Sequence, residues 1–172
     1  MFSKADIERY FTGEKQESWV FIAIGAAGII LAIIFFFVFR SNLHKGMAIP
    51  LFVIGLVLAI VGLTVYKRSD QQRIDNVYAY DMNPSKLKKE ELPRMKKVMK
   101  SFVLYRWVEI FLLTAGVALY IYFIRDFRHD FWRGFGFTLA IMAILALSAD
   151  YFAEKRGHAY TNGLESFTSN LK

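Results

Sequence analysis

Three ionisable residues lie inside or at the edge of apolar stretches of this 172-residue chain: Arg106, Glu109 and Asp150. Only 15 uncharged residues separate Glu109 from Arg125, whereas a helix needs about 20 residues to cross the ~30 Å hydrocarbon core of a bilayer. A helix that crosses here therefore takes Glu109 about two turns, and Arg106 about one turn, into the membrane. Because a charge at mid-bilayer costs roughly 2.5–3.5 kcal/mol on insertion scales, we expect these groups to have partners.

The intramembrane charge cluster of Arg106, Glu109 and Asp150 has two interpretations. Arg106 and Glu109 lie one helical turn apart, and Asp150 lies at a comparable depth in the next apolar run, so the three side chains can meet. In the functional interpretation they form an ion- or proton-handling site at an inner mouth. In the structural interpretation they fix the register of two neighbouring helices. We favour the structural one, because no second set of acidic residues continues a path deeper into the membrane.

No other set of residues points to chemistry. The chain has no cysteine, which excludes disulfides and thiolate metal sites. His44, His129 and His158 have no partner at the spacing of metal ligands, and no phosphate-binding loop or hydrolase motif is present. We therefore expect a non-enzymatic protein without a metal or cofactor. A membrane enzyme with a lipid-like substrate is a further hypothesis that no motif supports.

Four apolar runs of spanning length determine the predicted fold class. The chain is 55% hydrophobic and 17% aromatic, and its mean hydropathy is +0.31, which a soluble domain of this size would not combine with four such runs. We predict an all-α integral membrane protein with four transmembrane helices in an antiparallel bundle, short outer turns and a helical cytoplasmic face. The predicted regions are an N-terminal amphipathic segment (1–17), a first transmembrane hairpin (18–66), a basic loop (67–101), a second hairpin (102–151) and a tail (152–172).

The distribution of lysine and arginine predicts the orientation. Of the 22 basic residues, 16 lie in segments 1–17, 67–101 and 152–172, and only five lie in or beside the two short turns. Cytoplasmic loops carry the excess of positive charge, so we predict a cell membrane protein of the bacterial inner-membrane type with both termini in the cytoplasm. This topology also accounts for the net charge of +7 without nucleic acid as a partner.

Two segments outside the spans are predicted to form short surface helices. Segment 1–17 has a predicted break at Thr12-Gly13. In the basic loop, residues 83–85 (Asn-Pro-Ser) predict a turn and a helix cap, and five apolar residues then recur at helical spacing up to Phe102. We expect an interfacial helix whose basic residues contact anionic headgroups or a partner. These residues are Lys86, Lys88, Lys89, Arg94, Lys96, Lys97 and Lys100.

Small residues in the first two spans predict close helix packing. Pairs of Gly or Ala four residues apart let helix backbones approach closely, and two glycines seven residues apart offer a second groove. We expect tight packing within one chain, with self-association as the alternative. The candidate packing residues are Ala23, Ala27, Gly28, Ala32, Gly55 and Gly62.

The layout of four spans with both termini inside resembles that of immunity proteins for pore-forming toxins, and also that of many small bacterial membrane proteins. The resemblance covers topology only. We predict a protein that acts through protein–protein contacts within or at the cytoplasmic face of the membrane, such as an immunity protein or a scaffold. The alternative is a small homo-oligomeric channel or transporter. Anionic lipids on the cytoplasmic side, a protein partner and further copies of the chain are the expected contacts.

Overall fold

The computed structural model describes residues 2–169 and is helical throughout that range apart from short connections. Each of its four long helices contains an apolar window suited to crossing a membrane, which confirms the predicted all-α class with four helices suited to a membrane. The long helices are α1 (Lys4–Ile34), α2 (Asn42–Met82), α4 (Leu92–Phe123) and α5 (Asp130–Ser169). The short elements are η1 (Phe35–Phe39), α3 (Pro84–Lys86), η2 (Leu87–Glu91) and η3 (Phe127–His129).

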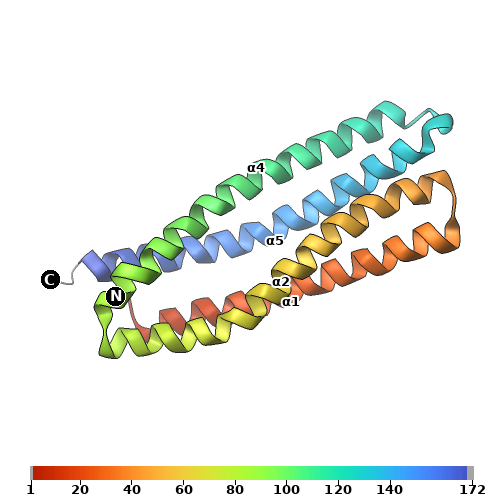
Figure 1. Cartoon of the computed structure of the whole chain (residues 1–172). Coiled ribbons are helices and arrows are strands. Elements are labelled where there is room, and N and C mark those ends of the chain that lie inside the picture. Colours follow the sequence, from red (N-terminus) through yellow and green to blue (C-terminus); the bar gives the residue numbers. More distant parts are fainter. Residues whose placement is uncertain (1, 170–172) are drawn as a thin grey trace.

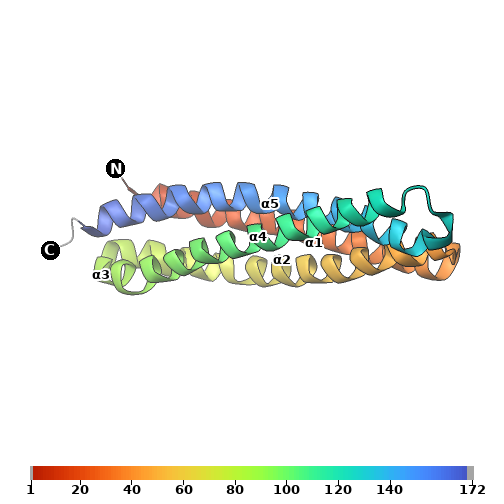
Figure 2. The ribbon, with the colours of Figure 1, turned by 90° about the horizontal axis from the view of Figure 1, so that it is seen from above.

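The chain folds back at each connection, so that α1 lies beside α2 and α4 lies beside α5 (Figure 1). Helix α5 also packs along α2 and touches α1, whereas α4 packs mainly against α5. Both termini lie at one end of the structure together with the α2–α3 connection, and the other two connections lie at the opposite end (Figure 2). We call these the termini end and the turn end.

The helices at the termini end are longer than the sequence predicts. The expected break at Thr12-Gly13 is wrong, because α1 runs through both residues. The side chain of Arg156 on α5 lies against Gly13, where an added Cβ would come within 2.7 Å of its Nη1. Residues 67–101, predicted as a loop with one amphipathic helix, are helical almost throughout, because α2 continues to Met82 before the predicted turn at 83–85, where Pro84 opens α3. Helix α5 continues through the predicted tail, of which residues 170–172 lie outside the described residues.

An apolar core at the termini end explains these extensions. It takes side chains from all the long helices, and Tyr10 stacks on Tyr160 with ring centroids 4.2 Å apart. Met95 is fully buried there, so the apolar side of the predicted interfacial helix packs into the protein and not against lipid. The core residues are Phe2, Ile7, Tyr10, Phe11, Ala79, Leu87, Met95, Tyr160 and Leu164.

Two glycine pairs bring the helix backbones together within the apolar segments. A Cβ added to Gly25 on α1 would lie 2.5 Å from the carbonyl oxygen of Gly55 on α2. A Cβ added to Gly116 on α4 would lie 2.9 Å from the carbonyl oxygen of Gly136 on α5. Such contacts stabilise helix pairs by close packing. Of the predicted packing residues, Gly28, Ala32, Gly55 and Gly62 are buried, whereas Ala23 and Ala27 are exposed on α1.

The two turns at the turn end are closed by local hydrogen bonds. Ser41 accepts a hydrogen bond from the backbone N–H of His44 at 3.3 Å and so caps α2. Asp126 is hydrogen-bonded to the ring of His129 at 2.7 Å and accepts from the backbone N–H of Arg128 at 3.0 Å. These two bonds hold the pKa of Asp126 below its usual value. His44 and His129 therefore serve the turns.

Candidate functional site

The structure brings the predicted charge cluster together between α4 and α5. Arg106 and Glu109 on α4 and Asp150 on α5 line one small cavity of about 60 Å³. Arg106 and Glu109 share a face of α4 because they lie three residues apart. The remaining lining residues are Phe102, Leu147, Tyr151 and Glu154.

The ion pair in this cluster differs from the predicted one. Arg106 donates a hydrogen bond through Nη2 to Oε1 of Glu154, a buried residue one turn beyond Asp150. The same oxygen lies 3.4 Å from Nε2 of His158. Glu154 lies outside the fourth span predicted from the sequence, which ends at residue 151. The spacing of four residues between Asp150 and Glu154 places both on one face of a continued helix, and this is the signal that could have found it.

Glu109 and Asp150 place two carboxyl groups at this cavity from opposite sides of the α4–α5 interface. Oε2 of Glu109 is buried and has no hydrogen-bond partner among the described residues. Arg106 is the cation that lines this cavity, and it is already used by Glu154. The cavity thus holds three carboxyl groups for one guanidinium, and this arrangement can hold a proton or accept a cationic group.

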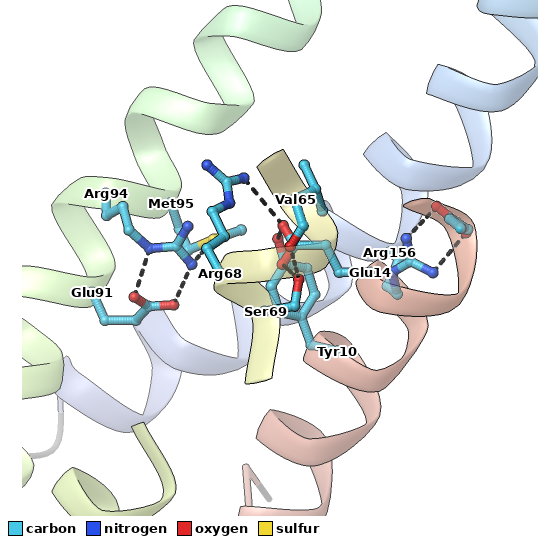
Figure 3. A network of polar contacts seen from close by, with 10 residues as sticks. Tyr10, Glu14, Val65, Arg68, Ser69, Glu91, Arg94, Met95 and Arg156 are labelled. Atoms are coloured by element: carbon cyan, nitrogen blue, oxygen red, sulfur yellow. Dashed lines mark hydrogen bonds and ion pairs between the residues drawn. The ribbon is translucent and has the colours of Figure 1, made fainter. Parts of the chain in front are cut away.

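A second polar network lies at the termini end (Figure 3). Arg94 donates two hydrogen bonds of 2.7 Å to the carboxylate of Glu91, which is buried. The hydroxyl of Tyr160 donates to Glu91 at 3.2 Å, and the Arg94 guanidinium lies 5.8 Å from the ring centre of Phe11. Arg94 therefore lies within the protein and does not belong to the predicted lipid-contacting surface.

Further ion pairs of this network connect α1 to its neighbours (Figure 3). Glu14 accepts from the Ser69 hydroxyl at 2.9 Å and pairs with Arg68 at 3.5 Å, both on α2. Arg156 on α5 pairs through both terminal nitrogens with Glu17, with Nη1 2.6 Å from Oε1. These contacts satisfy charges just where the apolar segment of α1 begins, so a structural role accounts for them.

The other predicted basic residues are exposed on α3, η2 and α4. Lys86 lies 3.9 Å from Glu90, and Lys96 lies 2.6 Å from Glu165 on α5. At 1.5 Å per residue, Lys100 is about 3 Å along the axis from Phe102, the first residue of the predicted span, and Lys86 is about 24 Å away. The exposed members of this set are Lys86, Lys88, Lys89, Lys96, Lys97 and Lys100.

A larger cavity of about 290 Å³ lies between α1 and α5 at the termini end. Of its three charged side chains, Asp6 accepts hydrogen bonds from Ser3 and Arg156 is paired with Glu17, whereas Arg9 is exposed to solvent. Among the described residues, no group of three or more His, Cys, Asp or Glu is arranged to hold a metal ion. The charge cluster between α4 and α5 is therefore the stronger candidate site.

Comparisons with protein-family models, with curated proteins and with solved structures give no match.

Proposed function

We propose that this chain is a non-enzymatic, four-span protein of a bacterial-type inner membrane that binds a membrane helix of another protein. In this proposal the apolar segments 18–39, 46–66, 102–124 and 131–151 cross the membrane as an antiparallel bundle, with the termini end in the cytoplasm. The apolar windows of the four helices and the concentration of basic residues at the termini end support this topology.

The open side of α4 carries the proposal. Because α4 packs mainly against α5, most of its circumference within the apolar segment is free of contacts with the rest of the chain. Three large aromatic side chains, Trp107, Phe111 and Tyr122, are 67%, 71% and 80% exposed there. Lipid alone can cover such a face, so the proposal needs a feature that favours protein.

The charge cluster supplies that feature at the edge of the α4–α5 contact, where it has an excess of carboxyl groups and where Arg106 is partly exposed. Glu109 itself points away from the three aromatic side chains, because it lies two residues, or about 200°, from both Trp107 and Phe111. A partner helix with one Lys or Arg at the depth of Glu109 and Asp150 would pair with these groups. Charged residues within a membrane normally pair with one another because leaving them unpaired is costly. The partner class is therefore a membrane helix with a single basic residue toward its cytoplasmic side. A membrane-inserting toxin neutralised by this chain, or a subunit of a complex scaffolded by it, fits that description.

A binding experiment with designed peptides tests the proposal. A leucine-rich transmembrane peptide with one Lys about two turns from its cytoplasmic-side end is reconstituted with the labelled protein in vesicles, and association is measured by energy transfer. We expect the Lys peptide to associate more strongly than an all-leucine peptide, and Glu109→Gln with Asp150→Asn to remove the difference. Glu165→Gln, which changes an exposed carboxylate at the termini end, is the matched control. Equal association of both peptides would contradict the proposal.

The second candidate function is a homo-oligomeric channel or transporter. The observation in its favour is the Glu109–Asp150 pair, since two carboxyl groups at one cavity can exchange a proton. Toward the turn end, however, α4 and α5 meet through the backbones of Gly116 and Gly136, which leaves no room for a path between them. We expect no ion conduction by the purified protein in planar bilayers. Reproducible currents that Asp150→Asn abolishes would favour the channel.

A further inference from the structure

Helix α2 carries an exposed apolar stripe beyond its apolar segment. Ile74, Tyr78 and Met82 are 56%, 67% and 70% exposed, and their spacing of four residues places them along one side of the helix. The second span proposed above ends at Tyr66. At 1.5 Å per residue, Met82 lies about 24 Å beyond that point. The stripe therefore lies in water, and lipid does not cover it.

The acidic residues beside this stripe already have partners within the chain. Asp81 forms an ion pair with Lys4 at 2.5 Å, and Asp75 accepts a hydrogen bond from Gln71 at 2.9 Å. The three apolar side chains of the stripe, in contrast, are exposed and are not covered by another part of the chain. Contiguous apolar side chains on a water-exposed surface mark an interaction site.

The stripe continues the side of α2 that faces away from the other helices in its apolar segment. Ile49, Val53, Leu56 and Ile60 are exposed there, with the 4-3-4 spacing of a helix–helix seam. Ile60 and Tyr78 are 18 residues apart, which is five turns of 3.6 residues, so they point in the same direction. A partner that covers this whole face must be a helix that crosses the membrane and continues about 24 Å beyond it.

We propose that the same face of α2 from a second copy covers it and forms a two-fold symmetric dimer. Copies in one membrane share an orientation, so the two α2 helices run parallel and each stripe residue meets its counterpart. The polar stretch 67–71 then meets its counterpart at one level, where headgroups begin. Two-fold symmetry places the two Asp75 residues on opposite sides of the seam. The exposed Lys67, seven residues before Ile74, meets its counterpart at the level where anionic headgroups can screen the two charges.

The size of the face is sufficient for a specific contact. Helix α2 has 41 residues and is therefore about 60 Å long. With a contact width of roughly 10 Å, close to the distance between packed helix axes, each copy would bury ~600 Å². The total of ~1,200 Å² lies at the lower limit of specific interfaces. The stripe in water alone would be too small, so the dimer uses both parts of the face.

Cross-linking tests the dimer directly, because the natural chain has no cysteine. Single variants Ile74→Cys, Tyr78→Cys and Met82→Cys are oxidised mildly in native membranes and separated by non-reducing electrophoresis. A disulfide requires Cα atoms within about 7 Å, so all three should give a dimer of this chain. Lys97→Cys, exposed on α4, is the matched control and should remain monomeric.

The contribution of Tyr78 to the dimer provides a second test. Tyr78→Ser should lower the association constant of the dimer in detergent roughly tenfold, and circular dichroism should not change because the side chain is exposed in the single chain. A monomeric mass of the unmodified protein in mild detergent and in nanodiscs, without cross-links at the three positions, would overturn the proposal. Cross-links from position 78 to a different protein, without dimers, would also overturn it. The dimer uses α2 and not α4, so its failure leaves the proposed partner site on α4 untouched.

Discussion

Arg106 forms its ion pair with Glu154 on α5, and not with Glu109 one turn away in its own helix. This pair links α4 to α5 at the end of their apolar segments that is nearer to the termini end (Figure 2). It also leaves the carboxyl groups of Glu109 and Asp150 to each other. The stability of the α4–α5 contact should therefore respond differently to changes in the two pairs.

Removing Arg106 should destabilise the protein. Arg106→Ala leaves the buried Glu154 carboxylate without its donor, which costs about 1–3 kcal/mol for an unsatisfied buried group. The double variant Arg106→Ala with Glu154→Gln should recover much of the loss. Thermal unfolding in detergent measures both. Strictly additive losses would show that the two side chains do not interact.

Neutralising one of the two facing carboxyl groups should not destabilise the protein in the same way. Glu109→Gln or Asp150→Asn removes like-charge repulsion and adds an amide donor, so we expect an unchanged or higher melting temperature. Glu165→Gln, at the exposed end of α5, serves as the control. A drop as large as that of Arg106→Ala would mean that this pair stabilises the fold.

Only the lysines closest to the apolar segment should bind anionic lipid. Lys97→Gln with Lys100→Gln should weaken association with phosphatidylglycerol by roughly 1 kcal/mol per charge, measured with spin-labelled lipid. Lys86→Gln with Lys89→Gln should have little effect, because these residues lie beyond the Debye length of about 8 Å at physiological salt. Equal losses in both variants would instead indicate binding along the whole basic surface.

The glycine contact between α4 and α5 should not tolerate a side chain. The Cβ of Gly116→Leu would lie only 2.6 Å from the backbone nitrogen of Ala140 on α5. Helix α4 must therefore move away from α5. We expect the free energy of unfolding to fall by several kcal/mol, at least as much as overpacking of a core costs. The melting temperature should fall accordingly. Ala118→Leu, on the exposed side of α4, should leave it unchanged and is the matched control.

The proposed topology can be checked with single cysteines at two exposed serines. Ser41→Cys, at the turn end, should react with an impermeant maleimide in intact cells. Ser85→Cys, at the termini end, should react only after the membrane is permeabilised. The opposite pattern would reverse the orientation and place the basic surface outside the cytoplasm.

Much of the fold follows from the sequence alone, because its causes are local. Four apolar runs of sufficient length determine four helices suited to a membrane. Pro84 and its neighbours determine the turn between α2 and α3. The depth of Arg106 and Glu109 and the proximity of Asp150 also follow from helix geometry, since side chains at fixed spacing share a face.

The tertiary structure alone decided the contacts between distant segments. Arg106 can pair with Glu154 because α5 continues past its apolar segment. The core around Tyr160 at the termini end stabilises that extension. The same core turns Met95 inward and draws Arg94 into its pair with Glu91. A sequence pattern shows that a helix has an apolar side, but lipid and protein can both cover it. Which of them does so depends on how the neighbouring helices are placed and how far they extend.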